Sequence, residues 1–102
     1  MIEFLFWEEC PSHVEALQLL RNVLADLGRG DEPVEILEVH TDGDVERLSF
    51  PGSPTIRVDG RDVDEAGAAA ARPALTCRIY HLPDGRPSPV PSRHQLEEAL
   101  RR

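Results

Sequence analysis

The stretch FLFWEECPSH, residues 4–13, marks the point where a hydrophobic run gives way to a cysteine followed by a proline. Residues 2–7 (IEFLFW) are apolar apart from Glu3 and rich in aromatic side chains, which is typical of a strand buried on both faces. Pro11 stands where a helix can begin, because a proline in the first turn sacrifices no hydrogen bond. The stretch therefore predicts a strand that leads directly into a helix, with Cys10 at the junction.

Beyond this junction, apolar residues recur at spacings of three and four, which indicates one buried helical face. The residues of this stripe are Val14, Leu17, Leu20, Leu24 and Leu27, widened by Ala16, Leu19 and Val23. Gly28 and Gly30 are expected to end the helix, since glycine tolerates a left-handed cap. Residues 34–39 (VEILEV) predict the next strand by their length and β-branching.

The middle of the chain predicts short elements separated by turns. Asp42 or Asp44 is expected to cap a brief helix that runs through residues 45–48. Residues 55–58 (TIRV) alternate as a half-buried strand, and the following Asp-Gly pair favours a hairpin turn, with residues 61–63 pairing back briefly. Residues 65–74 (EAGAAAARPA) predict a flexible or partly helical connection.

The last third of the chain predicts a strand, a loop and a closing helix. The strand is residues 76–82 (TCRIYHL), and the loop is the proline-stiffened stretch 83–91 (PDGRPSPVP). Ser92, three residues before Gln95, predicts a capping box at the start of the helix. The apolar stripe of that helix consists of Leu96, Ala99 and Leu100.

The predicted element order is β-α-β-α-β-β-α, in one domain that spans residues 1–102. The first strands alternate with helices and should be parallel, with right-handed crossovers. The last two strands, residues 55–58 and 76–82, should be antiparallel neighbours. The expected fold class is therefore α/β, with a four-stranded mixed sheet flanked by helices.

Composition and charge restrict which partners the protein can bind and in which compartment it is expected. The net charge of −8 argues against nucleic acid and anionic membrane surfaces, because proteins that bind them concentrate Lys and Arg. The N-terminal apolar run is too short to span a bilayer and lacks the basic start of a signal peptide, so a cytoplasmic location is expected. Two cysteines do not form a disulfide framework, and in a reducing cytosol both should rest as thiols.

Cys10 is the main candidate for chemistry. At a strand-to-helix junction, free backbone N–H groups and the positive end of the helix dipole stabilise a thiolate, which is both a nucleophile and a soft-metal ligand. His13 lies one turn further on, where it could stabilise the thiolate, accept the thiol proton or bind a metal. The negative charges of Glu8 and Glu9 would instead destabilise the thiolate and raise the pKa of the thiol. The plain alternatives are an inert core cysteine and a histidine that faces solvent.

The aromatic first strand, the Cys10-Pro11 pair and residues 52–55 (GSPT) before a strand resemble the thioredoxin-like superfamily over nearly the whole chain. The resemblance implies that Cys10 is the nucleophile and that Pro54 is a cis-proline lying opposite it. In that family the backbone at this proline pairs with a bound peptide, glutathione or disulfide partner. It therefore implies a substrate-binding role for Pro11, Ser53, Pro54 and Thr55.

More narrowly, the chain is similar to small bacterial thioredoxin-like proteins, several of which bear an alkylmercury lyase label. The matching segment is residues 75–78 (LTCR), together with Tyr80. The sequence departs from the dithiol thioredoxins because His13 stands where their second cysteine lies. The motif itself therefore cannot close a disulfide, and either Cys77 or an external thiol must resolve a mixed disulfide.

Two placements of Cys77 remain open at the level of sequence. The long connection before it could bring Cys77 to Cys10, and a bond would then require Cα atoms within about 7 Å. If residues 76–82 instead pair with residues 55–59 as a simple hairpin, Cys77 lies far from Pro54. In that case Cys77 would be a small apolar residue packed in a strand.

Three functions follow from these residues. The leading one is a thiol–disulfide oxidoreductase or thiol-transfer protein that uses Cys10 and acts on a protein or small-molecule thiol or disulfide, glutathione among them. The second is a soft-metal or organomercurial site at Cys10, Cys77 and His13, although a closed zinc site would need four ligands. The third is a redox-inert binding module that uses the proline loop or an edge strand. No phosphate loop, dinucleotide fingerprint or paired-carboxylate motif is present, so no cofactor is expected, and the oligomeric state stays open.

Overall fold

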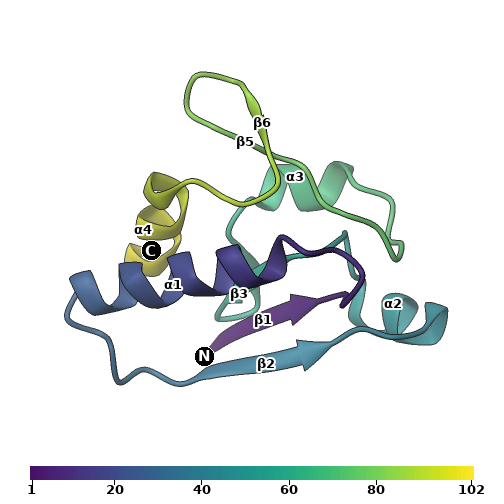
Figure 1. Cartoon of the computed structure of the whole chain (residues 1–102), viewed down its shortest axis with the longest axis horizontal. Helices are drawn as coiled ribbons and strands as arrows, with labels where there is room; N and C mark the ends of the chain where they lie inside the picture. Colours follow the sequence, from purple (N-terminus) through teal and green to yellow (C-terminus); the bar gives the residue numbers. More distant parts are fainter.

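In the computed structural model, which describes residues 1–102, strand β1 (Ile2–Phe6) lies inside a four-stranded mixed sheet. Strand β2 (Val34–Glu38) pairs with β1 in parallel, as expected. Strand β3 (Thr55–Val58) pairs with the other edge of β1 in antiparallel, so the expected parallel arrangement is wrong for this strand. Strand β4 (Arg61–Asp62) is antiparallel to β3. The sheet order is thus β2-β1-β3-β4, with helices packed around it (Figure 1).

The main core lies between one face of this sheet and two helices, α1 (His13–Asp26) and α4 (Arg93–Arg101). Alternate residues of β1, Ile2 and Phe4, point into it because side chains of a strand alternate between faces. The helices contribute the predicted stripes, namely Ala16, Leu20, Val23, Leu24, Leu96, Ala99 and Leu100. The buried face of α4 is the predicted one. The predicted stripe of α1 is buried in part: Val14 is 68% exposed, and Leu17, Leu19 and Leu27 are only partly buried.

A smaller cluster forms on the opposite face of the sheet. Leu5 of β1 packs there with Val39, Val45 and Phe50. Val45 belongs to the short helix α2 (Asp42–Leu48). The sheet is thus packed on both faces, as the predicted α/β class requires.

The helix starts differ in detail from the sequence prediction. Regular helix α1 begins at His13 with Ser12 at the N-cap, rather than at Pro11. Helix α2 is capped by Thr41, and Asp44 completes a reciprocal capping box instead of acting as the cap. The predicted starts are therefore off by one to three residues, because sequence preferences do not fix the residue at which regular hydrogen bonding begins.

At α4 only half of the predicted capping box forms. The Ser92 hydroxyl accepts a hydrogen bond from the Gln95 N–H at 3.1 Å, as expected. The Gln95 side chain does not return the bond to Ser92, and its Oε1 is buried without a partner. The helix start is nonetheless placed correctly by Ser92.

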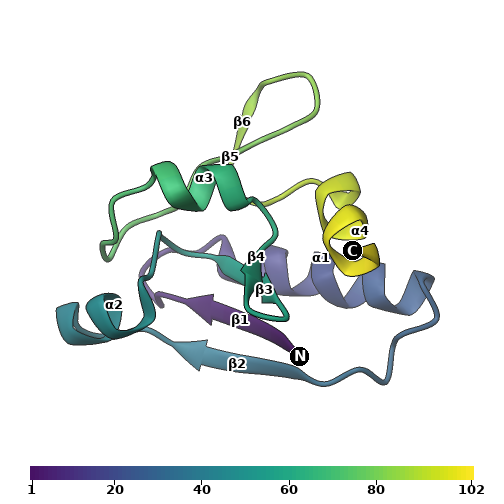
Figure 2. The ribbon, with the colours of Figure 1, turned by 180° about the vertical axis from the view of Figure 1, so that it is seen from behind.

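The prediction that residues 76–82 form the fourth strand of the sheet is wrong. The Asp59-Gly60 turn, with φ of 53° and 81°, folds the chain back at once, so that β4 occupies the edge of β3. Only Tyr80–His81 forms a strand in the later segment, β5, and it pairs with β6 (Pro87–Ser88). This pair forms a hairpin that projects from the body of the domain in both views (Figures 1 and 2).

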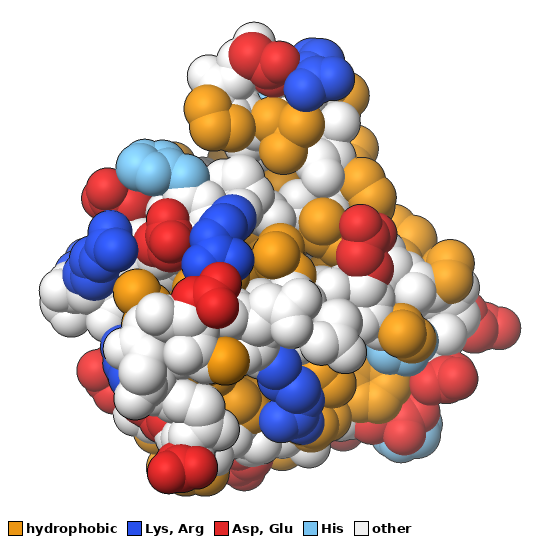
Figure 3. All heavy atoms as spheres, turned by 60° about the vertical axis from the view of Figure 1, so that its left-hand side comes forward, with side chains coloured by type: hydrophobic (Ala, Val, Ile, Leu, Met, Phe, Trp, Pro, Cys, Tyr) orange, Lys and Arg blue, Asp and Glu red, His pale blue; other side chains and the backbone are white.

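Helix α3 (Glu65–Ala70) connects β4 to this later segment and contains no buried residue, in agreement with the predicted partly helical connection. Acidic and basic side chains are interspersed on the face shown in Figure 3, so the net charge of −8 does not form a continuous patch there. None of the helices has the length and apolar character needed to cross a membrane.

Candidate redox-active site

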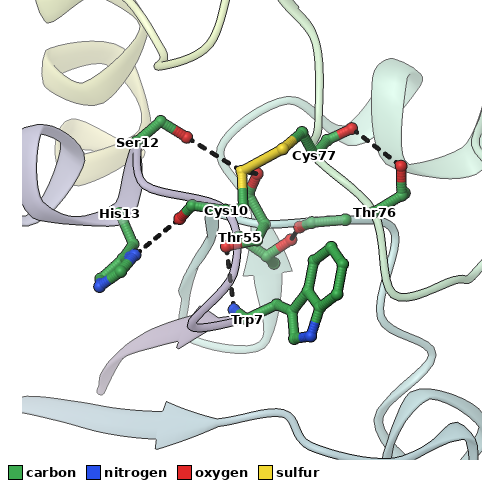
Figure 4. Close-up of a disulfide and its surroundings, with 9 residues drawn as sticks. Trp7, Cys10, Ser12, His13, Thr55, Thr76 and Cys77 are labelled. Atoms are coloured by element: carbon green, nitrogen blue, oxygen red, sulfur yellow. Dashed lines mark hydrogen bonds between the residues drawn. A yellow bond between two sulfur atoms is a disulfide. The ribbon is translucent and has the colours of Figure 1, made fainter.

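Cys10 and Cys77 form a disulfide, and their Cα atoms are 5.6 Å apart (Figure 4). The bond joins the chain just before α1 to the segment that follows α3. Of the two placements that the sequence left open, the one in which Cys77 reaches Cys10 is therefore confirmed. The simple hairpin with residues 55–59 does not form.

Backbone pairing brings Cys77 to this position. The Ser53 N–H donates to the Thr76 carbonyl and the Arg78 N–H donates to the Ser53 carbonyl, both at 2.8 Å, as a short parallel bridge. Gly52 makes the close approach possible, since a Cβ on it would lie 3.1 Å from the Cβ of Arg78. Its φ of +129° is also one that other residues rarely adopt.

The two ends of the disulfide differ in exposure. Cys10 is 1% exposed and lies in the interior, whereas Cys77 is exposed at the surface. The bond therefore has one end that solvent reaches and one end that it does not. Exposed disulfides are the ones that external thiols reduce readily.

Two polar groups lie against the buried sulfur. The Ser12 hydroxyl oxygen is 3.3 Å from Cys10 Sγ, and the Ser53 carbonyl oxygen is 3.5 Å from it. Once the bond is reduced, the Ser12 hydroxyl can donate to a thiolate, while the Ser53 carbonyl can only accept from a thiol. The hydroxyl is free to do so because Ser12 makes no side-chain cap bond to α1.

His13 lies beside Cys10 but contacts its backbone. Its Nδ1 donates to the Cys10 carbonyl at 2.7 Å, and its ring stacks on Phe6 with centroids 4.7 Å apart. Its Nε2 is 3.7 Å from a carboxylate oxygen of Glu8. Both ring nitrogens thus face oxygen atoms, and His13 fixes the turn that carries Cys10.

The residues expected to bind substrate lie in two different environments. Pro11 is exposed, whereas Ser53, Pro54 and Thr55 are buried. The Ser53–Pro54 peptide bond is cis.

The Pro54 loop is held by contacts within the chain. The Trp7 N–H donates to the Ser53 hydroxyl at 2.9 Å, and the Tyr80 hydroxyl donates to the Pro54 carbonyl at 2.6 Å. Residues 76–80 cover the loop, and they already use both backbone groups of Ser53.

Sequence reasoning missed a buried ion pair next to Cys77. Two nitrogens of the Arg78 guanidinium donate to the two carboxylate oxygens of Asp62, each at 2.7 Å. The same guanidinium donates to Thr55 Oγ1 at 3.2 Å and lies 4.5 Å from the ring centre of Tyr80. Burial is the largest single effect and opposes the charge, but the hydrogen bonds to Asp62 and the nearby negative charges together outweigh it, so the pKa of Arg78 is raised above its ordinary value.

This ion pair holds residues 76–80 against β3 and β4. The only signal in the sequence is the alternation in TCRIY, where Arg78 and Tyr80 point inward and their neighbours point outward. Burial also raises the pKa of the Tyr80 phenol, which keeps its hydroxyl a donor.

The site lies on the surface and not in a cleft. Neither cysteine lines any of the three surface pockets of the molecule. No group of three or more His, Cys, Asp or Glu side chains is placed to hold a metal ion. No protein-family model, curated protein or solved structure matches the chain.

Proposed function

We propose that this protein is a thioredoxin-like thiol–disulfide oxidoreductase that cycles between a Cys10–Cys77 disulfide and a dithiol. The observation that carries the proposal is the disulfide itself, which joins a buried sulfur before α1 to an exposed sulfur. In the reducing direction the dithiol donates two electrons and two protons to a substrate disulfide, which leaves as two thiols. The protein disulfide forms in the same reaction.

The exposure of Cys77 supports a catalytic bond over a structural one. Structural disulfides resist the glutathione pool, whereas exposed bonds have higher potentials and are labile. The polar contact from Ser12 supports the same assignment, because a hydroxyl that can donate to a thiolate stabilises the reduced, ionised form. An apolar surrounding would favour only the bonded form or the neutral thiol.

The expected substrates are small disulfides or thiols, such as glutathione, and exposed disulfides on proteins. No surface pocket is lined by Cys10 or Cys77, so the reacting sulfur of the partner meets the bond at the surface. Such a site suits a partner that brings its own exposed sulfur.

Equilibration in glutathione buffers tests this function. The protein is incubated over a series of reduced-to-oxidised ratios, quenched in acid, alkylated and read by mass spectrometry. We expect a midpoint between about −180 and −320 mV, the range of cellular thiol couples. A bond that stays intact across the whole series would make it structural and would contradict the proposal.

A soft-metal site is the second candidate, because reduction would leave two neighbouring thiolates, and thiolates select soft metals such as Cu(I). Titrating the reduced protein with Cu(I) against a bathocuproine competitor tests it. The matched control is the double variant Cys10→Ala/Cys77→Ala. Equal uptake by the two proteins would remove this candidate.

A further inference from the structure

We infer that external sulfur enters this site through Cys77, and that Cys10 is the leaving and resolving sulfur. The inference rests on the proposed thiol–disulfide function. It differs from the expectation drawn from the resemblance, in which Cys10 is the attacking nucleophile. The observations that carry it are the unequal burial of the two cysteines and the polar contacts of the buried one.

Access is the first argument. A thiolate must approach the sulfur that it attacks, and Cys10 is 1% exposed while Cys77 lies at the surface. The Cys10 sulfur is enclosed by Ser12 and by the buried Ser53 carbonyl. Around Cys77, by contrast, Thr76 and Ile79 are both exposed. An incoming sulfur therefore meets an exposed residue at Cys77 and a buried one at Cys10.

The leaving group is the second argument. Thiol–disulfide exchange is faster when the departing thiolate is better stabilised. Attack at Cys77 expels the Cys10 thiolate, which lies 3.3 Å from the Ser12 hydroxyl, two residues before the N-cap of the 14-residue helix α1. Attack at Cys10 would instead expel a thiolate at the exposed Cys77, where solvent, and no side chain of the protein, would donate to it. Both arguments thus favour the same sulfur.

The steps balance in both directions. An external thiolate attacks Cys77 Sγ, a new sulfur–sulfur bond forms, and the electron pair of the protein disulfide passes to Cys10 as a thiolate. A second external thiolate then attacks the external sulfur of this mixed disulfide, which releases the Cys77 thiolate and a small-molecule disulfide. In reverse, the Cys77 thiolate attacks a substrate disulfide and Cys10 then attacks Cys77, expelling the second substrate thiolate.

The position of Cys77 suits this role mechanically. Its neighbour Arg78 is anchored by Asp62 through two hydrogen bonds of 2.7 Å, and Ser53 pairs with the backbone on both sides of Cys77. These contacts hold Cys77 beside Cys10 after the bond breaks. The resolving step is then an attack between two groups already in place.

Mapping the mixed disulfide tests the inference. The oxidised wild-type protein is mixed with excess glutathione, quenched in acid at successive times, and digested for mass spectrometry. We expect the earliest mixed disulfide on Cys77, with Cys10 as a free thiol, at least about tenfold more abundant than the reverse species. Early glutathione on Cys10 would overturn the inference while leaving the oxidoreductase function intact.

Two single variants provide an independent measurement that excludes transfer between the cysteines. Reduced Cys10→Ser, which retains Cys77, and Cys77→Ser, which retains Cys10, are each treated with oxidised glutathione after circular dichroism has confirmed their folding. We expect Cys10→Ser to be modified at least about tenfold faster. Faster modification of Cys77→Ser would contradict the inference. If wild-type protein does not react with glutathione at all, the proposed function fails, and this inference fails with it.

Discussion

Ser12 shows how the role of a single side chain depends on where its hydroxyl points. By position it is the N-cap of α1, and serine is among the preferred residues there. Its hydroxyl makes no cap bond and lies against Cys10 Sγ instead. The sequence identifies the junction and its cysteine. It cannot show whether the rotatable Ser12 hydroxyl bonds to the backbone of α1 or to the sulfur of Cys10.

Ser12→Ala should slow the reaction of reduced Cys10 with iodoacetamide at neutral pH by about twofold to threefold. Loss of a hydrogen bond of roughly 1 kcal/mol lowers the thiolate fraction about fivefold. The remaining thiolate is somewhat more nucleophilic, which recovers part of the rate. The measurement is the site-resolved alkylation rate of the reduced protein.

Ser92→Ala is the matched control for that variant. The Ser92 hydroxyl does cap its helix, at α4, so its loss should cost about 1 kcal/mol of unfolding free energy without changing the reaction of Cys10. Ser12→Ala should show the opposite pattern, with altered reactivity and nearly unchanged stability. Equal alkylation rates in the two variants would show that Ser12 does not act on the sulfur.

Gly52→Ala should destabilise the fold by roughly 1–3 kcal/mol and slow closure of the disulfide, because the new Cβ would collide with Arg78 at a strained φ. Gly60→Ala separates the two causes. Gly60 also has a positive φ, of +81°, but nothing lies within 4 Å of its Cβ position. Chemical denaturation and the rate of oxidation from the dithiol form are compared. Similar losses in the two variants would mean that the contact with Arg78 is unimportant.

At the scale of elements, the long periodic segments were predictable, and so was the two-residue strand β4, because the Asp59-Gly60 turn marks it. The helical stripe of α1 involves enough residues for burial to leave a pattern. The strand at β3 was also predicted, although three of its four residues are buried and not the alternate ones alone. Strands β5 and β6 contain two residues each, so no periodicity can distinguish them. The segment 76–82 was misassigned because its alternate side chains do point inward, but they do so to form the Arg78 ion pair and the Tyr80 hydrogen bond and not to join the sheet.

Asp62→Asn should destabilise the protein by about 3–5 kcal/mol, because it leaves the buried Arg78 guanidinium without its opposite charge. It should also lower the rate at which the two cysteines re-form their bond, since Arg78 adjoins Cys77. Urea denaturation in the oxidised state measures the first effect. Oxidation of the dithiol form measures the second.

Glu65→Gln is the control for this ion pair. Glu65 pairs with Arg61 at 2.7 Å and with Arg102 at 3.6 Å. Glu65 and Arg61 are more than half exposed, at 52% and 55%, and such surface pairs contribute at most about 1 kcal/mol. A loss for Asp62→Asn no larger than that for Glu65→Gln would show that burial adds nothing to the Asp62–Arg78 pair.

At the scale of the whole molecule, the sequence predicted an α/β domain with a mixed four-stranded sheet, and the structure has one. It also named both cysteines of the site. Whether they meet depends on backbone pairing between residues 53 and 76–78, which are far apart in sequence. Pairing of this kind depends on the turn at Gly60 and the path of α3, and neither is encoded near the cysteines themselves.

Reduction of the disulfide should lower the free energy of unfolding by about 4 kcal/mol, the chain-entropy value for a loop of this length. For a domain of this size the melting temperature should then fall by roughly 15–30 °C. Thermal melts with and without dithiothreitol measure the change. The double variant Cys10→Ser/Cys77→Ser should melt at one temperature in both buffers. If the wild-type protein melted at the same temperature with and without dithiothreitol, this prediction would be contradicted.

The disulfide also determines how the molecule responds to a pulling force. It joins positions 67 residues apart, so in the oxidised protein a force on the two termini cannot extend the chain between them. Roughly 230 Å of contour length is shielded in this way, at about 3.4 Å per residue. Only the first nine residues and those after Cys77 bear the load. A single reducing event under tension would release the shielded length as one abrupt extension, so the domain would act as a tether whose reach is set by thiol chemistry.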